Sequence, residues 1–137
     1  MHKIKNYKEA IDCFKKTLKT EPEFKNANNN LGVIFYKLGE NLKAITCYKN
    51  EIQINSLNIN AYNNLGIVFY NSGEIHKARS SFEKAIQIDP NFIGAHNNLA
   101  ILYYDIKETE KAINCFERVL KIDPKNKEAN YNLGKIY

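Results

Sequence analysis

The apolar residues of this chain recur with the three- to four-residue spacing of amphipathic helices. Within residues 7–20, Ile11, Phe14 and Leu18 share one helical face, and Pro22 ends the pattern because the residue before a proline disfavours helical geometry. The same spacing predicts further helices over residues 25–38, 42–54, 59–72, 75–88, 93–106, 109–122 and from 127 onwards, with turns at 39, 73 and 107; residues 1–5 extend the first helix as a frayed end. The sequence therefore predicts an all-α protein.

The pattern repeats with a period of 34 residues. Leu31-Gly32, Leu65-Gly66 and Leu99-Ala100 occupy one position of this period, and Ala44, Ala78 and Ala112 occupy another. A fixed period of this length is typical of stacked helical hairpins. Glycine inside a helix lowers stability by about 0.5–1 kcal/mol relative to alanine. We therefore expect the glycines to lie where the partner helix approaches too closely for a larger side chain.

The repeat resembles the tetratricopeptide repeat, whose signature combines an aromatic residue, Leu-Gly, a second aromatic residue, Ala-x3-Phe and proline. The middle repeat carries all of these, as Tyr62, Leu65, Gly66, Phe69, Ala78, Phe82 and Pro90. The third repeat departs with His96 and Ala100, and the first with Asn28 and Ser56. The resemblance covers essentially the whole chain. It implies an α-solenoid, a right-handed superhelix of antiparallel helix pairs, with full repeats at 25–58, 59–92 and 93–126 between half-repeats at 1–24 and 127–137.

In proteins that this chain resembles, side chains of the first helix of each repeat face a concave groove. The matching residues here are Asn26, Asn29, Asn30, Val33, Tyr36, Asn60, Asn63, Asn64, Ile67, Tyr70, Asn97, Asn98, Ile101, Tyr104 and Asn132, with Lys37, Asn71, Gly94 and Asp105 beside them. An asparagine amide both donates and accepts, so this row suits the backbone of an extended peptide. The row is also explained by bonds between neighbouring repeats, or by a composition that includes 20 asparagines among 137 residues.

We expect the chain to act as a protein–protein interaction scaffold that binds an extended peptide in this groove. One alternative is a self-associating array, because the chain holds four periods plus one residue and its half-repeats would leave Phe14, Leu18, Leu133 and Ile136 uncovered for head-to-tail stacking. Another is a substrate-adaptor fragment of a glycosyltransferase, because the Asn-Asn-Leu-Gly runs resemble the arrays of O-GlcNAc transferases and SPINDLY proteins. The resemblance to co-chaperone clamps is weaker, since Asn26, Asn60 and Gly94 stand where those clamps carry cations.

Several function classes are not favoured. The sequence has none of the common phosphate-binding or hydrolase motifs, so we expect no enzyme and no cofactor. The net charge is +5, but the lysines are interspersed with acidic residues, which argues against nucleic acid as a partner. No apolar run approaches the ~18 residues of a membrane span, and no secretory leader pattern is visible. A cytoplasmic protein is the resulting expectation.

Two further features give local predictions. Cys13, Cys47 and Cys115 fall at one repeat position, which predicts small core or half-buried sites, with no disulfide between repeats and no metal centre. Glu51 stands where the other repeats carry Ala85 and Val119. We expect its carboxylate to reach solvent or a lysine.

Overall fold

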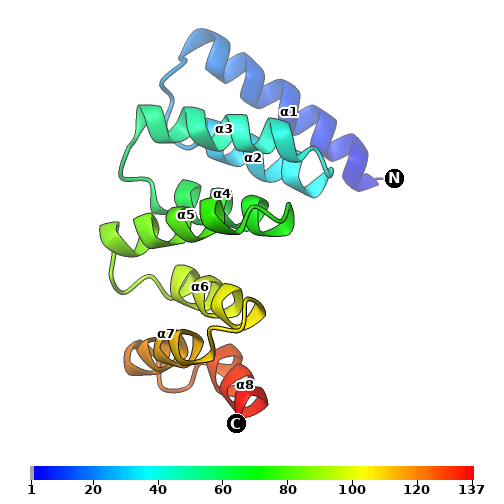
Figure 1. The fold of residues 1–137 in the computed structure, drawn as a ribbon. Helices are drawn as coiled ribbons and strands as arrows, with labels where there is room; N and C mark the ends of the chain where they lie inside the picture. Colours follow the sequence, from blue (N-terminus) through cyan, green and yellow to red (C-terminus); the bar gives the residue numbers. More distant parts are fainter. Residues whose placement is uncertain (1) are drawn as a thin grey trace. The chain divides into compact units, whose positions relative to one another are not determined.

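The computed structural model describes residues 2–137, with side chains from residue 4 onward. These residues form eight helices and no strand (Figure 1): α1 (His2–Thr20), α2 (Ala27–Lys37), α3 (Asn41–Ile54), α4 (Ile59–Asn71), α5 (Ile75–Ile88), α6 (Ile93–Asp105), α7 (Thr109–Ile122) and α8 (Lys127–Ile136). Most bounds lie within two residues of the predicted ones; α1 begins earlier than its apolar pattern indicates. The all-α prediction is confirmed.

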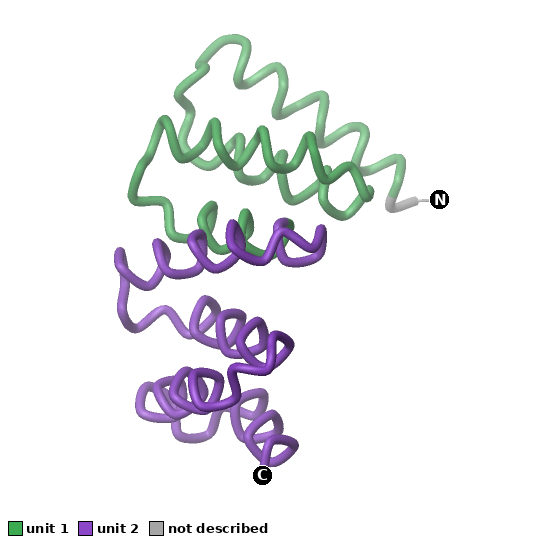
Figure 2. The backbone as a smooth tube through the Cα atoms, in the orientation of Figure 1, with its two compact units in different colours: residues 1–68 green, residues 69–137 purple. Residues whose placement is uncertain are grey.

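The chain divides into two compact units, Met1–Val68 and Phe69–Tyr137 (Figure 2). In the first unit, α2 packs against both α1 and α3. In the second, α6 packs against α5 and α7, and α7 also packs against α8. Along the described part of the chain, no helix has the length and apolar character needed to cross a membrane.

The turns that close the first helices share one backbone arrangement. Gly39, Gly73 and Lys107 all have positive φ, at 79°, 80° and 69°. The next residue after each donates its backbone N–H to a carbonyl five residues earlier, as Glu40 does to Phe35 at 2.8 Å. This bond satisfies a carbonyl that the end of the helix leaves free, and the left-handed residue makes it possible. The predicted turns at 39, 73 and 107 are thus confirmed.

The core is built on close contacts between small and aromatic side chains. A Cβ atom added to Gly32 would lie 2.7–3.1 Å from three ring atoms of Tyr48, so alanine does not fit there without a shift. Ala44, Ala78 and Ala112 have no exposed surface, and Ala100 is equally buried in a cluster with Phe116. The expectation that Gly32 marks a close approach of two helices is confirmed.

Glu51 departs from its prediction. Its side chain is fully buried, and it reaches neither solvent nor a lysine. Instead its two carboxylate oxygens accept the backbone N–H groups of Asn26, at 3.1 Å, and Asn29, at 3.2 Å. The first turn of α2 leaves such N–H groups without helical partners, and their partial positive charge stabilises a carboxylate. The prediction was wrong because it did not consider a helix N-terminus as the partner.

Other helices obtain the same cap from a nearer residue. Asn58 accepts the N–H of Ala61 at 3.1 Å, and Asn126 accepts that of Ala129 at 2.9 Å. In α2 the residue before the helix is Asn26, whose φ of 68° is left-handed and whose side chain makes no cap bond. Glu51 on the neighbouring helix therefore supplies the acceptor that the local sequence does not provide.

Two expectations about exposure need correction. Leu133 is buried, at 8% exposure, within the cluster formed by Phe116 and its neighbours, whereas Phe14, Leu18 and Ile136 are half-buried. Leu133 is covered because it faces α7 and not the free side of α8. Cys13 is exposed, although Cys47 is buried and Cys115 half-buried. Cys13 lies on α1, which packs mainly against α2, and this contact does not cover its side chain.

Candidate functional site

The first unit presents a row of predicted groove residues along α2 and the start of α4. On α2, Asn30 is exposed, and Val33 and Tyr36 are half-buried, whereas Asn29 is buried at 8% exposure. On α4, Asn60 is exposed, and Asn63, Asn64 and Ile67 are half-buried. Asn26 is exposed at the start of α2. The row thus combines side chains that solvent reaches with amides packed between helices.

Some of these amides connect α2 to α4. Asn64 donates its side-chain amide to the Asn29 side-chain oxygen at 3.1 Å, and Asn58 donates to the Asn26 side-chain oxygen at 2.9 Å. Since Asn58 also caps α4 and Asn26 also donates to Glu51, the N-terminal ends of two first helices share one hydrogen-bonded network. These bonds give Asn26, Asn29 and Asn64 a structural role, whatever else they contact.

In the second unit the equivalent amides are arranged differently. Asn97 occupies the repeat position of Asn29 and is 5% exposed, but its side-chain oxygen is buried without a hydrogen-bond partner. Asn132 occupies the repeat position of Asn64 and lies on the wall of a pocket. The Asn64–Asn29 bond is therefore not reproduced by Asn132 and Asn97.

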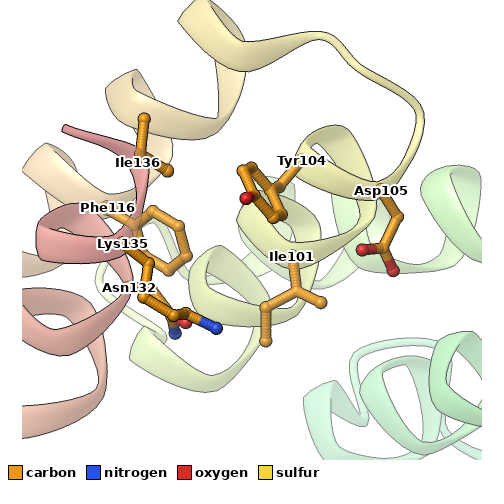
Figure 3. Close-up of a pocket in the computed structure, with 7 residues that line it drawn as sticks. All are labelled: Ile101, Tyr104, Asp105, Phe116, Asn132, Lys135 and Ile136. Carbon is orange, nitrogen blue, oxygen red and sulfur yellow. The ribbon is translucent and has the colours of Figure 1, made fainter.

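This pocket lies between α6, α7 and α8 and has a volume of about 210 Å³ (Figure 3). Figure 3 shows Ile101 and Tyr104 of α6 facing Asn132 and Ile136 of α8, with the Phe116 ring on the α8 side. Phe116 is 1% exposed and belongs to the core, whereas Tyr104 is 42% exposed. The pocket is thus an apolar hollow that opens from the core to the surface of the first helices.

Two charged side chains border the pocket. The Asp105 carboxylate accepts a hydrogen bond from the Tyr70 hydroxyl. The Lys135 ammonium lies 5.0 Å from the centre of the Tyr131 ring, one helical turn earlier on α8. Figure 3 shows Asp105 and Lys135 on opposite sides of the pocket. The pocket therefore has an anionic and a cationic side.

The structure brings Ile101, Tyr104 and Asn132 together, as the repeat positions suggest. Asn98, on the same helix face, is half-buried, and Tyr70 reaches the pocket only through its bond to Asp105. Sequence reasoning missed Lys135, Ile136 and Phe116. A signal for Lys135 was present, because it occupies the repeat position of Val33, Ile67 and Ile101.

Burial affects two of the three cysteine thiols. Burial raises the pKa of the Cys47 thiol to about 11, which the nearby Lys15 only partly offsets, and burial raises the pKa of the Cys115 thiol to about 11. Both thiols therefore stay protonated and unreactive near neutral pH. Within residues 2–137 the three cysteines are free, and no group of His, Cys, Asp and Glu side chains is placed to hold a metal ion.

Family models match most of the chain. A model described as tetratricopeptide repeat matches residues 59–92 and 94–126, and one described as TPR repeat matches residues 34–73. No curated protein matches the chain.

Solved structures share the fold over nearly the full length. The crystal structure of MamA is 26% identical, with 96% of this chain and 77% of that chain covered, and a TM-score of 0.86. The crystal structure of YrrB, described as a TPR protein with an unusual peptide-binding site, is 25% identical, with 95% and 67% covered, and a TM-score of 0.82. The first TPR of Spaghetti (RPAP3), bound to an HSP90 peptide, is 24% identical, with 80% and 89% covered and a TM-score of 0.76, and shows the likeness of fold alone.

Proposed function

The chain belongs to the tetratricopeptide repeat family, and from this premise we propose that it is a protein-interaction scaffold that binds an extended peptide along the exposed face of its first helices. The observation that carries the proposal is the mixed character of the first helices within each unit. Asn30 and Val33 on α2 in the first unit, and Ile101 and Tyr104 on α6 in the second, keep polar and apolar groups within reach of solvent. The likeness to YrrB, which has a peptide-binding site, supports the same function.

The asparagine amides alone do not provide enough binding free energy. Each hydrogen bond to a peptide contributes about 0.5–1.5 kcal/mol net, so four contribute roughly 2–6 kcal/mol. Micromolar affinity requires about 8 kcal/mol, and the ordering of the peptide adds to the requirement. Asn64 is also already bonded to Asn29. Apolar side chains on the same face must therefore supply a large part of the affinity.

The experiment is a selection from short random peptides with blocked ends, followed by NMR titration of the chain with the selected peptides. We expect binding, with shifts at Asn30 and Val33 for peptides that contact the first unit and at Ile101 for peptides that contact the second. Val33→Asp should abolish or strongly weaken the binding of peptides that cross the first unit, whereas Lys49→Asp, on the exposed surface of α3, should leave it unchanged. Thermal unfolding of each variant shows whether it is folded.

Two results would overturn the proposal. One is the selection of no peptide, with a molar mass in light scattering that rises with concentration, which would favour head-to-tail self-association instead. The other is peptide binding that maps onto the exposed surfaces of α3, α5 and α7 and that Val33→Asp does not change.

A further inference from the structure

The pocket between α6, α7 and α8 has the size and lining of a site for one apolar side chain. Its volume of about 210 Å³ lies below the ~300–1,000 Å³ of pockets that enclose whole small-molecule ligands. It exceeds the ~150 Å³ apolar cavity that accommodates benzene in an engineered protein. Ile101, Tyr104, Phe116 and Ile136 provide apolar surface. A leucine, methionine or phenylalanine side chain fits these dimensions.

The α8 side of the pocket offers a donor and a cation to whatever enters. Asn132 lines the pocket and leaves the Asn97 oxygen unpaired, in contrast to the bonded Asn64 and Asn29 of the first unit. The Asn132 amide is therefore positioned toward the pocket and not committed to its neighbour. Lys135, exposed on the same helix, adds a positive charge at this side.

The α6 side has the opposite charge. The Asp105 carboxylate lies at that side and accepts a hydrogen bond from the Tyr70 hydroxyl. A second carboxylate is therefore disfavoured near Asp105 and favoured near Lys135. The α8 side of the pocket offers only Lys135 and the Asn132 amide as donors, which is few for the carboxylate of a free C-terminus. The carboxylate of one acidic side chain is therefore the better match for this side of the pocket.

We propose that this pocket is the specificity site of the scaffold, and that it selects an internal peptide segment with a large apolar side chain flanked by an acidic residue. The apolar side chain enters the hollow above Phe116, the acidic residue contacts Lys135, and the Asn132 amide bonds the peptide backbone between them. This inference rests on the proposed function, because it assumes that a peptide lies along the first helices.

The experiment uses the full chain and random peptides with acetylated N-termini and amidated C-termini, with a parallel set that carries free C-termini. We expect the selected peptides to share a large apolar residue with Asp or Glu within two positions, with or without the free carboxylate. Alanine at the apolar position should weaken binding about tenfold, which corresponds to ~1.4 kcal/mol. Lys135→Glu should change the preferred neighbour from acidic to basic and weaken the original peptides about fivefold. The control is Lys127→Glu, an exposed lysine of α8 outside the pocket, which should leave the preference unchanged.

A second measurement locates the peptide. Isoleucine methyl NMR should show shifts at Ile101 and Ile136 but not at Ile4 on α1 when a selected peptide is added. This inference would be overturned by peptides that bind without shifting the Ile101 and Ile136 methyl signals and whose affinity Lys135→Glu does not change. The proposed scaffold function would then still stand. Selection that depends on the free C-terminus would also overturn it. If no peptide is selected at all, the proposed function fails together with this site.

Discussion

Replacing Glu51 with alanine should destabilise the first unit. The substitution removes a fully buried carboxylate that accepts the backbone N–H groups of Asn26 and Asn29. Alanine is not unusual at this place in the repeat, because the second repeat has the fully buried Ala85 there. The repeat therefore accommodates alanine at this position elsewhere, and we expect the loss of the helix cap to be the main contribution to the change in stability.

The magnitude follows from the two bonds and from what each donor does without them. Asn26 is exposed, so its N–H can bond to water, whereas Asn29 is 8% exposed and its N–H would stay buried and unpaired. An unpaired buried donor lowers stability by about 1–3 kcal/mol, and the loss of a helix cap lowers it by about 0.5–2 kcal/mol. These overlapping contributions give an expected decrease of about 2–4 kcal/mol in the free energy of unfolding. Glu51→Gln retains one acceptor oxygen and should lose about half of this.

Urea unfolding followed by circular dichroism measures the change, and amide hydrogen exchange locates it. Exchange should accelerate at Asn29 and remain unchanged at Ala129, which Asn126 caps in the second unit. Gln53→Ala, at an exposed position of the same helix, is the matched control. The reasoning is refuted if Glu51→Ala is as stable as the parent chain or more stable, since the desolvation of the buried carboxylate would then outweigh its two bonds.

Three further changes test other contacts. Gly32→Ala should lower the free energy of unfolding by about 1–3 kcal/mol, because the added methyl group meets a tyrosine ring. Gly134→Ala, whose added Cβ has nothing within 4 Å, should raise it by about 0.5–1 kcal/mol, and equal effects of the two substitutions in urea unfolding would contradict the close approach at Gly32. Asn64→Ala should cost about 1 kcal/mol by leaving a buried amide oxygen unpaired, and Asn132→Ala should change the same measurement little. Burial holds the pKa of the Cys47 thiol at about 11, so only about one Cys47 thiol in a thousand is ionised at pH 8. In a mass-spectrometric time course iodoacetamide should therefore modify the exposed Cys13 before Cys47, and comparable rates at the two cysteines would contradict the buried position of Cys47.

The sequence by itself determined the helices and the contacts that repeat with them. Spacing of apolar residues placed α2 through α8, and the glycine inside α2 indicated where Tyr48 approaches. Such features are local, or recur at a fixed period, so a single chain displays them. Repeat positions also named Ile101, Tyr104 and Asn132 as groove residues, and these three line one pocket, but they did not indicate that Phe116, Lys135 and Ile136 complete its lining.

Only the tertiary structure decided which polar groups are paired. Glu51 finds its donors more than twenty residues away on α2, Asn64 reaches Asn29 across two first helices, and Asn132 at the equivalent repeat position does not reach Asn97. The asparagine at this one repeat position therefore links two helices in the first unit, as Asn64, and lines a pocket in the second, as Asn132. The physical reason is that a hydrogen bond forms only when the donor–acceptor distance is correct to within a few tenths of an ångström. A repeat period specifies which helices are neighbours, but not their separation to that accuracy.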